Sequence, residues 1–113
     1  MKKILSFTAV AEILTGLALL VVPALVGELL LGAALTGIAI PLARVTGIAL
    51  VALGISCGPG TPLIGMLTYS AGVALYLAYF GFTSPTSGML LWPAVILHLI
   101  LTVFLVREFS GKD

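Results

Sequence analysis

Charged side chains are scarce in this sequence. Of its 113 residues, 8% are Asp, Glu, Lys or Arg, whereas 61% are hydrophobic. An ordinary soluble domain has about 25% charged residues. The net charge of +1, without a basic stripe carrying interleaved aromatics, excludes a nucleic-acid-binding surface. The sequence therefore predicts an integral protein of the lipid bilayer.

Residues that carry chemistry are equally few. Cys57 is the only cysteine, His98 the only histidine and Asp113 the only aspartate. These counts exclude an intrachain disulfide and disfavour a zinc or di-iron site and a hydrolase triad. The sequence therefore disfavours an enzyme, assigns no catalytic or metal-binding residue and names no cofactor.

Four long apolar runs are present instead. A membrane-spanning helix needs about 20 apolar residues, and these runs are separated by prolines, glycines and polar turns. They predict an all-α polytopic membrane protein, a compact four-transmembrane-helix bundle forming a single domain over residues 1–113. The predicted spans are residues 3–22, 42–57, 62–82 and 89–106.

The connection between the first two spans is itself apolar. It covers residues 24–40, after Pro23 ends the first span and before Pro41 opens the second. A long loop in water would not be so hydrophobic. We expect a short interfacial helix or a re-entrant segment with Glu28 in water, and a partial fifth span is the alternative.

Lysine and arginine set the predicted orientation. They cluster at both chain ends and are absent from the two short loops, with Lys2 and Lys3 at one end and Arg107 and Lys112 at the other. With an even number of spans, this distribution predicts an inner-membrane protein with both termini in the cytoplasm.

One acid, Glu12, lies inside the first apolar run. At 1.5 Å per residue it is about 13 Å past Lys3, near the middle of a hydrocarbon layer about 30 Å thick. Its helix face also carries small and hydroxyl side chains, including Thr8 and Thr15, so Glu12 is expected to face protein. An ionisable group at this depth is a candidate functional site.

Arg44 and His98 are the ionisable residues of the later spans. His98 lies about 13 Å below the outer surface, a depth similar to that of Glu12. The long side chain of Arg44 can reach toward that depth from further out. We therefore predict a buried polar cluster of Glu12, Arg44 and His98, which either fixes helix register or serves a function.

Tyrosines and glycines follow the later spans at three- and four-residue spacing. The tyrosines serve either helix packing or the lining of a ligand cavity. The candidates to line a cavity are Thr8, Thr15, Tyr69, Tyr76 and Tyr79. Gly47 and Gly54 are expected to face the first span, and residues 29–37 are expected to contribute contacts with another chain.

Two stretches carry a resemblance to a known group. They are TGLALL at residues 15–20, with Pro23 after it, and ARVTGIALVALG at residues 43–54. This order resembles the first half of small bacterial four-span proteins of the DoxX-like group and its uncharacterised relatives. The resemblance implies a four-helix membrane fold and assigns no chemistry.

A second resemblance, to the small multidrug resistance exporters, rests on the chain length, the four spans and Glu12 in the first span. The function predicted first is an accessory protein or subunit of a membrane assembly, or a holder of a lipid-soluble molecule. Its partners would be a second copy or another membrane protein, and a lipophilic small molecule. The alternative is a proton-coupled exporter in which Glu12 binds both proton and substrate.

Overall fold

The computed structural model describes residues 2–58, 60–84 and 88–111, and all regular structure within these ranges is helical. The helices are α1 (Lys2–Val21), α2 (Pro23–Leu31), α3 (Ala39–Cys57), α4 (Pro62–Thr83) and α5 (Leu91–Phe109). Four of them, α1, α3, α4 and α5, are long and apolar enough to cross a membrane. The predicted all-α bundle with four helices of membrane-spanning length is confirmed.

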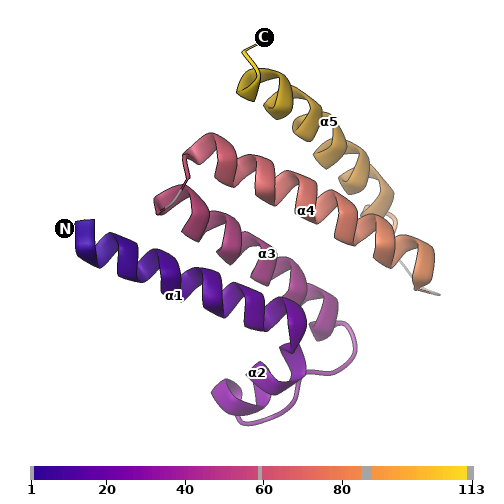
Figure 1. The fold of residues 1–113 in the computed structure, drawn as a ribbon. Coiled ribbons are helices and arrows are strands. Elements are labelled where there is room, and N and C mark those ends of the chain that lie inside the picture. Colours follow the sequence, from indigo (N-terminus) through magenta and orange to yellow (C-terminus); the bar gives the residue numbers. More distant parts are fainter. Residues whose placement is uncertain (1, 59, 85–87, 112–113) are drawn as a thin grey trace.

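The four long helices lie side by side in the order α1, α3, α4, α5 (Figure 1). Among the described residues, α1 touches neither α4 nor α5, and α3 does not touch α5. The Cα atoms extend over 43 × 38 × 15 Å, so the bundle is a thin slab. Neighbouring helices run antiparallel, which brings the start of α1, the turn between α3 and α4 and the end of α5 to the same side.

Glycines bring α1 and α3 together. A Cβ built on Gly16 would lie 2.5 Å from the carbonyl oxygen of Gly47, and one built on Gly47 would lie 2.5 Å from that of Gly16. A Cβ on Gly54 would lie 2.7 Å from the carbonyl oxygen of Ala9. Residues without a side chain permit this approach of two backbones. The expectation that Gly47 and Gly54 face the first span is therefore confirmed.

Proline and glycine set the limits of the apolar connection. The helix is interrupted at Val22, and α2 begins at Pro23, a position where the missing N–H of proline is harmless. Gly32 ends α2 with a φ of +87°, a conformation that favours glycine. Thus the expected short helix is present as α2, and Glu28 on it is exposed.

The later helices differ slightly from the predicted spans. α3 begins three residues before the predicted start, and Pro41 fits within it because first-turn N–H groups have no intrahelical partner. α5 begins two residues late, because residues 88–91 form a turn in which Leu91 donates to Gly88. Thr61 caps α4 by accepting a 3.2 Å hydrogen bond from the N–H of Ile64. Pro59, in the turn before it, lies outside the described residues.

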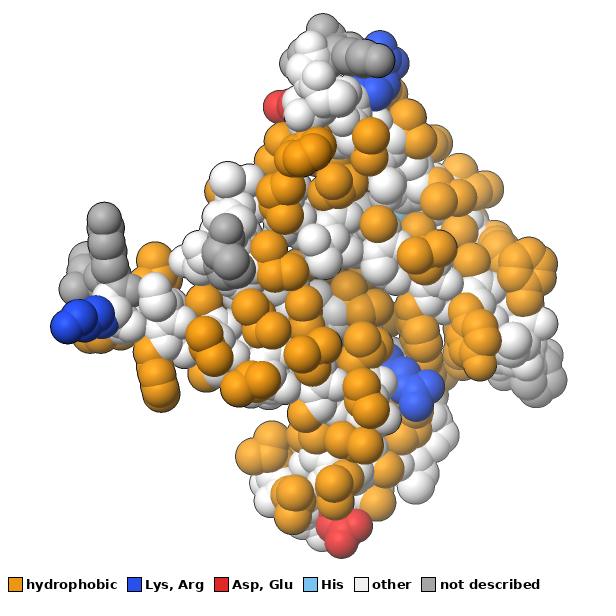
Figure 2. Space-filling model, in the orientation of Figure 1, with side chains coloured by type: hydrophobic (Ala, Val, Ile, Leu, Met, Phe, Trp, Pro, Cys, Tyr) orange, Lys and Arg blue, Asp and Glu red, His pale blue; other side chains and the backbone are white. Residues whose placement is uncertain are grey.

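A single chain buries few of its side chains. In the edge helices α1 and α5, 11% and 6% of the residues in the most apolar stretch are buried, against 22% in α3 and α4. Figure 2 shows hydrophobic side chains spread over the whole visible face, with few charged groups among them. Lipid or other protein must cover such a surface.

Candidate functional site

Glu12 lies on α1 beside the contact with α3. Ala9 and Gly16, which touch α3, are about one turn before and after it. Its side chain is half-buried, and no described residue provides it with a hydrogen bond or an ion pair. The carboxyl group is therefore placed within an apolar helix without a polar partner from the described part of the chain.

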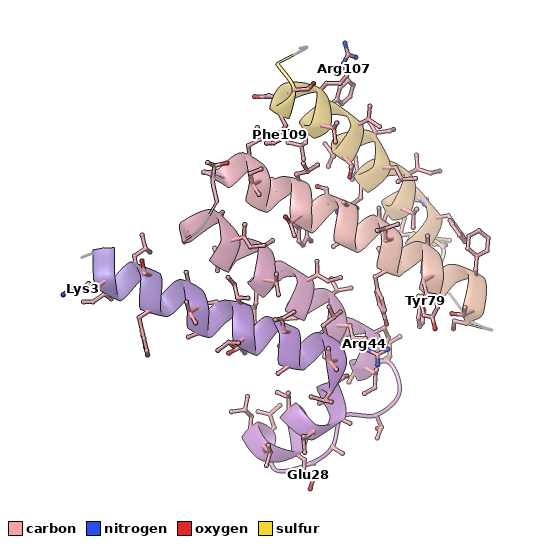
Figure 3. The ribbon with its side chains drawn as sticks, in the orientation of Figure 1. Lys3, Glu28, Arg44, Tyr79, Arg107 and Phe109 are labelled. Atoms are coloured by element: carbon pink, nitrogen blue, oxygen red, sulfur yellow. The ribbon has the colours of Figure 1, made fainter. Side chains whose placement is uncertain are left out.

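Arg44 lies near the start of α3, closer than Glu12 to the end of the slab that carries α2 (Figure 3). It is one turn before Gly47, and a Cβ on Gly47 would touch Leu19 and Leu20 of α1. Because α1 and α3 are antiparallel, Arg44 is displaced from Glu12 by about two helical turns, roughly 11 Å. The Nε atom of Arg44 is buried and has no partner among the described residues.

His98 lies on α5 and contacts Tyr69 of α4. The two rings meet edge to face, with centroids 5.9 Å apart and an interplanar angle of 66°. Nδ1 of His98 lies 2.7 Å from the carbonyl oxygen of Ala94. A carbonyl oxygen only accepts, so Nδ1 is the donor, and Nε2 of the neutral ring is left as an acceptor.

The three predicted cluster residues lie on three different helices. Two helices, α3 and α4, separate Glu12 from His98, and packed helix axes are about 8–10 Å apart. Glu12 and His98 are therefore roughly 25 Å apart across the slab, although they lie at similar heights along their helices. Within one chain, the described residues do not form a buried cluster of Glu12, Arg44 and His98.

Two of the predicted cavity-lining residues are threonines of α1 that bond to their own helix. The hydroxyls of Thr8 and Thr15 each donate a 2.8 Å hydrogen bond to the carbonyl oxygen four residues earlier, and both residues are exposed. This arrangement satisfies a hydroxyl in an apolar environment without another molecule.

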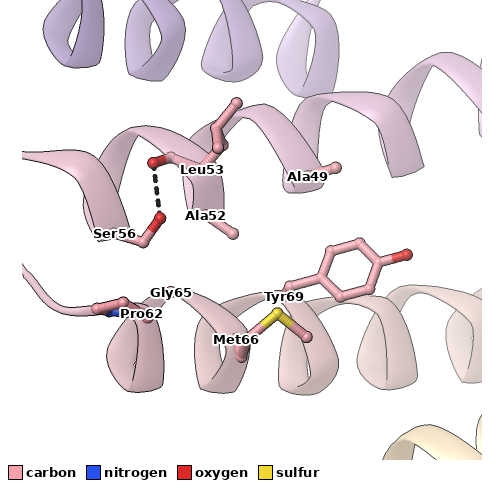
Figure 4. Close-up of a pocket in the computed structure, with 8 residues that line it drawn as sticks. All are labelled: Ala49, Ala52, Leu53, Ser56, Pro62, Gly65, Met66 and Tyr69. Carbon is pink, nitrogen blue, oxygen red and sulfur yellow. Dashed lines mark hydrogen bonds between the residues drawn. The ribbon is translucent and has the colours of Figure 1, made fainter. Parts of the chain in front are cut away.

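The predicted tyrosines divide into two groups along α4. Tyr76 and Tyr79 contact each other, with ring centroids 6.4 Å apart, and Tyr79 is 61% exposed. Tyr69 lies nearer the other end of α4, where its ring sits between α3 and α4 (Figure 4). There it borders a groove between the two helices.

This groove, which we call the α3–α4 groove, has a volume of about 410 Å³. A volume of this size is typical of small-molecule sites. Its lining is mostly small or apolar, and the hydroxyl of Ser56 is already donated to the carbonyl oxygen of Leu53 at 2.9 Å. The lining residues are Ala49, Ala52, Leu53, Ser56, Pro62, Gly65, Met66 and Tyr69 (Figure 4).

Most of these lining residues were not predicted from the sequence. The available signal was a second stripe of small residues on the same helix as Gly47 and Gly54, formed by Ala49, Ala52 and Ser56 at three- and four-residue spacing. The two stripes share one helix because α3 has a neighbour on each side. The Gly47 stripe meets α1, and the Ala52 stripe meets α4.

No group of three His, Cys, Asp or Glu side chains that could hold a metal ion exists within residues 2–58, 60–84 and 88–111. Besides Arg44, the arrangement offers two separate polar positions in the apolar slab. One is the carboxyl of Glu12 beside the α1–α3 contact, and the other is the ring pair of Tyr69 and His98 beside the groove.

Comparison with known proteins adds no relative to these observations. No protein-family model, no curated protein and no solved structure matches the chain. The resemblances to the DoxX-like group and to the small multidrug resistance exporters stay predictions from the sequence.

Proposed function

We propose that this small multi-pass membrane protein acts as an accessory protein or subunit of an inner-membrane assembly, or holds a lipid-soluble molecule, with both termini cytoplasmic. The observation that carries the assembly role is Glu12, a half-buried acid within α1 that has no polar partner among the described residues. Ionisable groups at this depth almost always face protein or a water-filled cavity. A side chain from another copy, or from another membrane protein, supplies that partner in the assembly.

The shape of the chain supports the same proposal. A row of helices leaves both broad faces of the slab uncovered, and the edge helices α1 and α5 each have one long neighbour. Lipid covers apolar side chains as well as protein does, but it does not satisfy a carboxyl group or the buried Nε of Arg44. The polar groups therefore favour protein contact over lipid alone.

The test compares Glu12→Gln with Glu28→Gln, a matched control at an exposed acid on α2 outside the four long helices. The wild-type protein, crosslinked in native membranes and then sized after solubilisation, is expected to exceed the 11.6 kDa of one chain. Glu12→Gln is expected to move the protein toward the monomer, because the charge that a partner recognises is lost. Glu28→Gln is expected to leave the assembly unchanged.

A strictly monomeric wild-type protein at every concentration, with no co-purifying membrane protein, contradicts the assembly role. Unchanged assembly of Glu12→Gln contradicts the role given to this carboxyl. Helical content by circular dichroism, measured on each variant, separates loss of assembly from loss of folding.

The proton-coupled exporter is a second candidate, and the same unpaired carboxyl favours it. An acid that binds proton and substrate in turn must be reachable, and Glu12 is neither fully buried nor held by an ion pair from the described residues. Here Glu12→Gln is expected to leave assembly intact and to abolish pH-dependent binding of a lipophilic cation such as tetraphenylphosphonium. Undisturbed binding in the variant excludes the exporter.

A further inference from the structure

Two ring side chains that contact each other, Tyr69 and His98, have polar atoms without partners among the described residues. Nδ1 of His98 is engaged by the carbonyl oxygen of Ala94, and no described residue donates to its Nε2. No described residue forms a hydrogen bond with the hydroxyl of Tyr69. Both side chains are half-buried, so another molecule can reach these atoms, and the hydrocarbon layer offers no water to satisfy them.

These two rings are in contact, and one of them borders a cavity. Tyr69 lines the α3–α4 groove while its ring meets that of His98 at a centroid distance of 5.9 Å. His98 does not itself line the groove, and the Tyr69 ring is the side chain that connects the groove with His98. Tyr69 is about 10 Å along α4 from Pro62, so the contact between the two rings lies within the hydrocarbon layer.

The groove, Nε2 of His98 and the hydroxyl of Tyr69 together indicate the chemical class of a ligand. Nε2 of His98 needs a donor, and the hydroxyl of Tyr69 can donate to an acceptor, so one hydroxyl group on a ligand satisfies both. The groove has no charged lining residue, which favours a neutral ligand. Met66 and the Tyr69 ring favour an aromatic ring, since thioethers and aromatic rings attract each other and flat rings pack well.

We propose that the α3–α4 groove binds a neutral, membrane-soluble phenol, whose hydroxyl group donates to Nε2 of His98 and accepts from the hydroxyl of Tyr69. The phenol ring lies against Tyr69 and Met66, and an alkyl tail extends along the groove. This inference rests on the small-molecule part of the proposed function and names its ligand class and its site. It does not depend on Glu12, which lies on α1 outside the groove lining.

The test uses the full chain in nanodiscs and two probes, 4-hexylphenol and 4-hexylanisole, whose methyl ether cannot donate a hydrogen bond. Saturable binding is measured by equilibrium dialysis against empty nanodiscs. The phenol is expected to bind about tenfold more tightly than the anisole, as one lost hydrogen bond of about 1.4 kcal/mol requires. Tyr69→Phe and His98→Leu are each expected to reduce this preference by a similar factor.

Tyr79→Phe is the matched control, because Tyr79 lies on the same helix but is 61% exposed and does not line the groove. This variant is expected to bind the phenol as the wild type does. Ala49→Leu is expected to weaken binding of both probes, because it fills the groove without removing a polar group. It keeps the site testable if His98→Leu fails to fold.

Equal binding of phenol and anisole to the wild type overturns the proposal, because the groove then accepts any apolar chain. Phenol-selective binding that survives Tyr69→Phe and Ala49→Leu also overturns it, but retains a small-molecule role at another site. No saturable binding of either probe overturns this inference, whereas the assembly role of the proposed function is decided separately by the crosslinking of Glu12→Gln.

Discussion

Most hydroxyl groups in the long helices are satisfied by the helix that carries them. Six threonines donate to the carbonyl oxygen four residues earlier, namely Thr8, Thr15, Thr46, Thr68, Thr83 and Thr102. Such hydroxyls are compatible with lipid and indicate no ligand or partner. The informative residues are those left over, since a polar atom without a partner is costly in hydrocarbon.

These remaining polar groups are of different kinds. Glu12, the hydroxyl of Tyr69 and Nε2 of His98 belong to half-buried side chains that another molecule can reach. The hydroxyl of Ser70 is different, because this residue is 1% exposed and its oxygen has no partner among the described residues. The accessible groups therefore define the two candidate sites, whereas Ser70 lies in the packed interior of the slab.

Gly47 and Gly16 are two glycines whose replacement would force the backbones of α1 and α3 apart, and Gly47 is the one to test. In Gly47→Ala the new Cβ would lie 2.5 Å from the carbonyl oxygen of Gly16, and a backbone atom cannot rotate away as a side chain would. Overpacking of this kind costs about 1–3 kcal/mol. Unfolding of the solubilised protein by sodium dodecyl sulfate is expected to require less denaturant.

Whether Gly47→Ala lowers or raises the stability of the protein distinguishes overpacking from helix propensity. Alanine is favoured over glycine in a helix interior by about 1 kcal/mol, so propensity alone predicts stabilisation. Gly88→Ala is the control, because a Cβ there meets no atom within 4 Å and the φ of Gly88 is not positive. A variant of Gly47 more stable than the wild type would show that α1 and α3 are not in close contact.

Among the individual helices, the start of α4 has a feature that α2, α3 and α5 lack. Thr61 provides a side-chain cap to α4, whereas no side-chain cap hydrogen bond is formed at the start of the other three. α4 is also the helix that joins α5 to the slab, because α5 touches no other helix in the described residues. The stability of α4 therefore determines whether α5 is held.

Thr61→Ala is expected to destabilise the protein by about 1 kcal/mol, the usual effect of removing an N-cap hydrogen bond. The loss leaves the N–H of Ile64 without its 3.2 Å acceptor at the end of the helix. The measurement is again denaturant unfolding of the solubilised protein. Thr61→Ser keeps the acceptor oxygen and should behave as the wild type, so equal destabilisation by both substitutions would exclude capping as the cause.

Local features of the helices were predictable because they depend on neighbouring residues. Pro23, Pro41 and Pro62 lie in the first turn of a helix, where a missing N–H is harmless. The start of α5 was less predictable, because the turn at residues 88–91 has no strong proline or glycine pattern beyond Gly88. The close contact of Gly47 with the first span followed from its small-residue stripe.

The order of the helices across the slab was not predictable in the same way. Counting residues gives the height of Glu12 and His98 along their helices, but it does not give their lateral distance. The long helices are apolar on all sides, so no polar face shows which helix lies beside which. For this reason the sequence analysis predicted a cluster of Glu12, Arg44 and His98. In the structure of one chain, these residues lie on separate helices.

The arrangement of the whole molecule leads to a prediction of its orientation in the membrane. Successive long helices are antiparallel, so the start of α1 and the end of α5 are on one side, and the start of α3 and the end of α4 are on the other. The positive residues at the two chain ends favour the cytoplasm for the first side. Reporters fused to either terminus should therefore be active only when they function in the cytoplasm.

Reporters inserted beside Glu28 or Ser84 should be active only outside the cytoplasm. Glu28 lies on α2, which follows the end of α1, and Ser84 follows the end of α4, so both are on the side away from the termini. The turn between α3 and α4 is an internal control, since an insertion at Gly60 must give the same result as the termini. An external C-terminus with a cytoplasmic N-terminus would mean that one of α1, α3, α4 and α5 does not cross the membrane. In that case Glu12 and His98 would no longer share a height in the bilayer, and the depth inferred for one of them would be wrong.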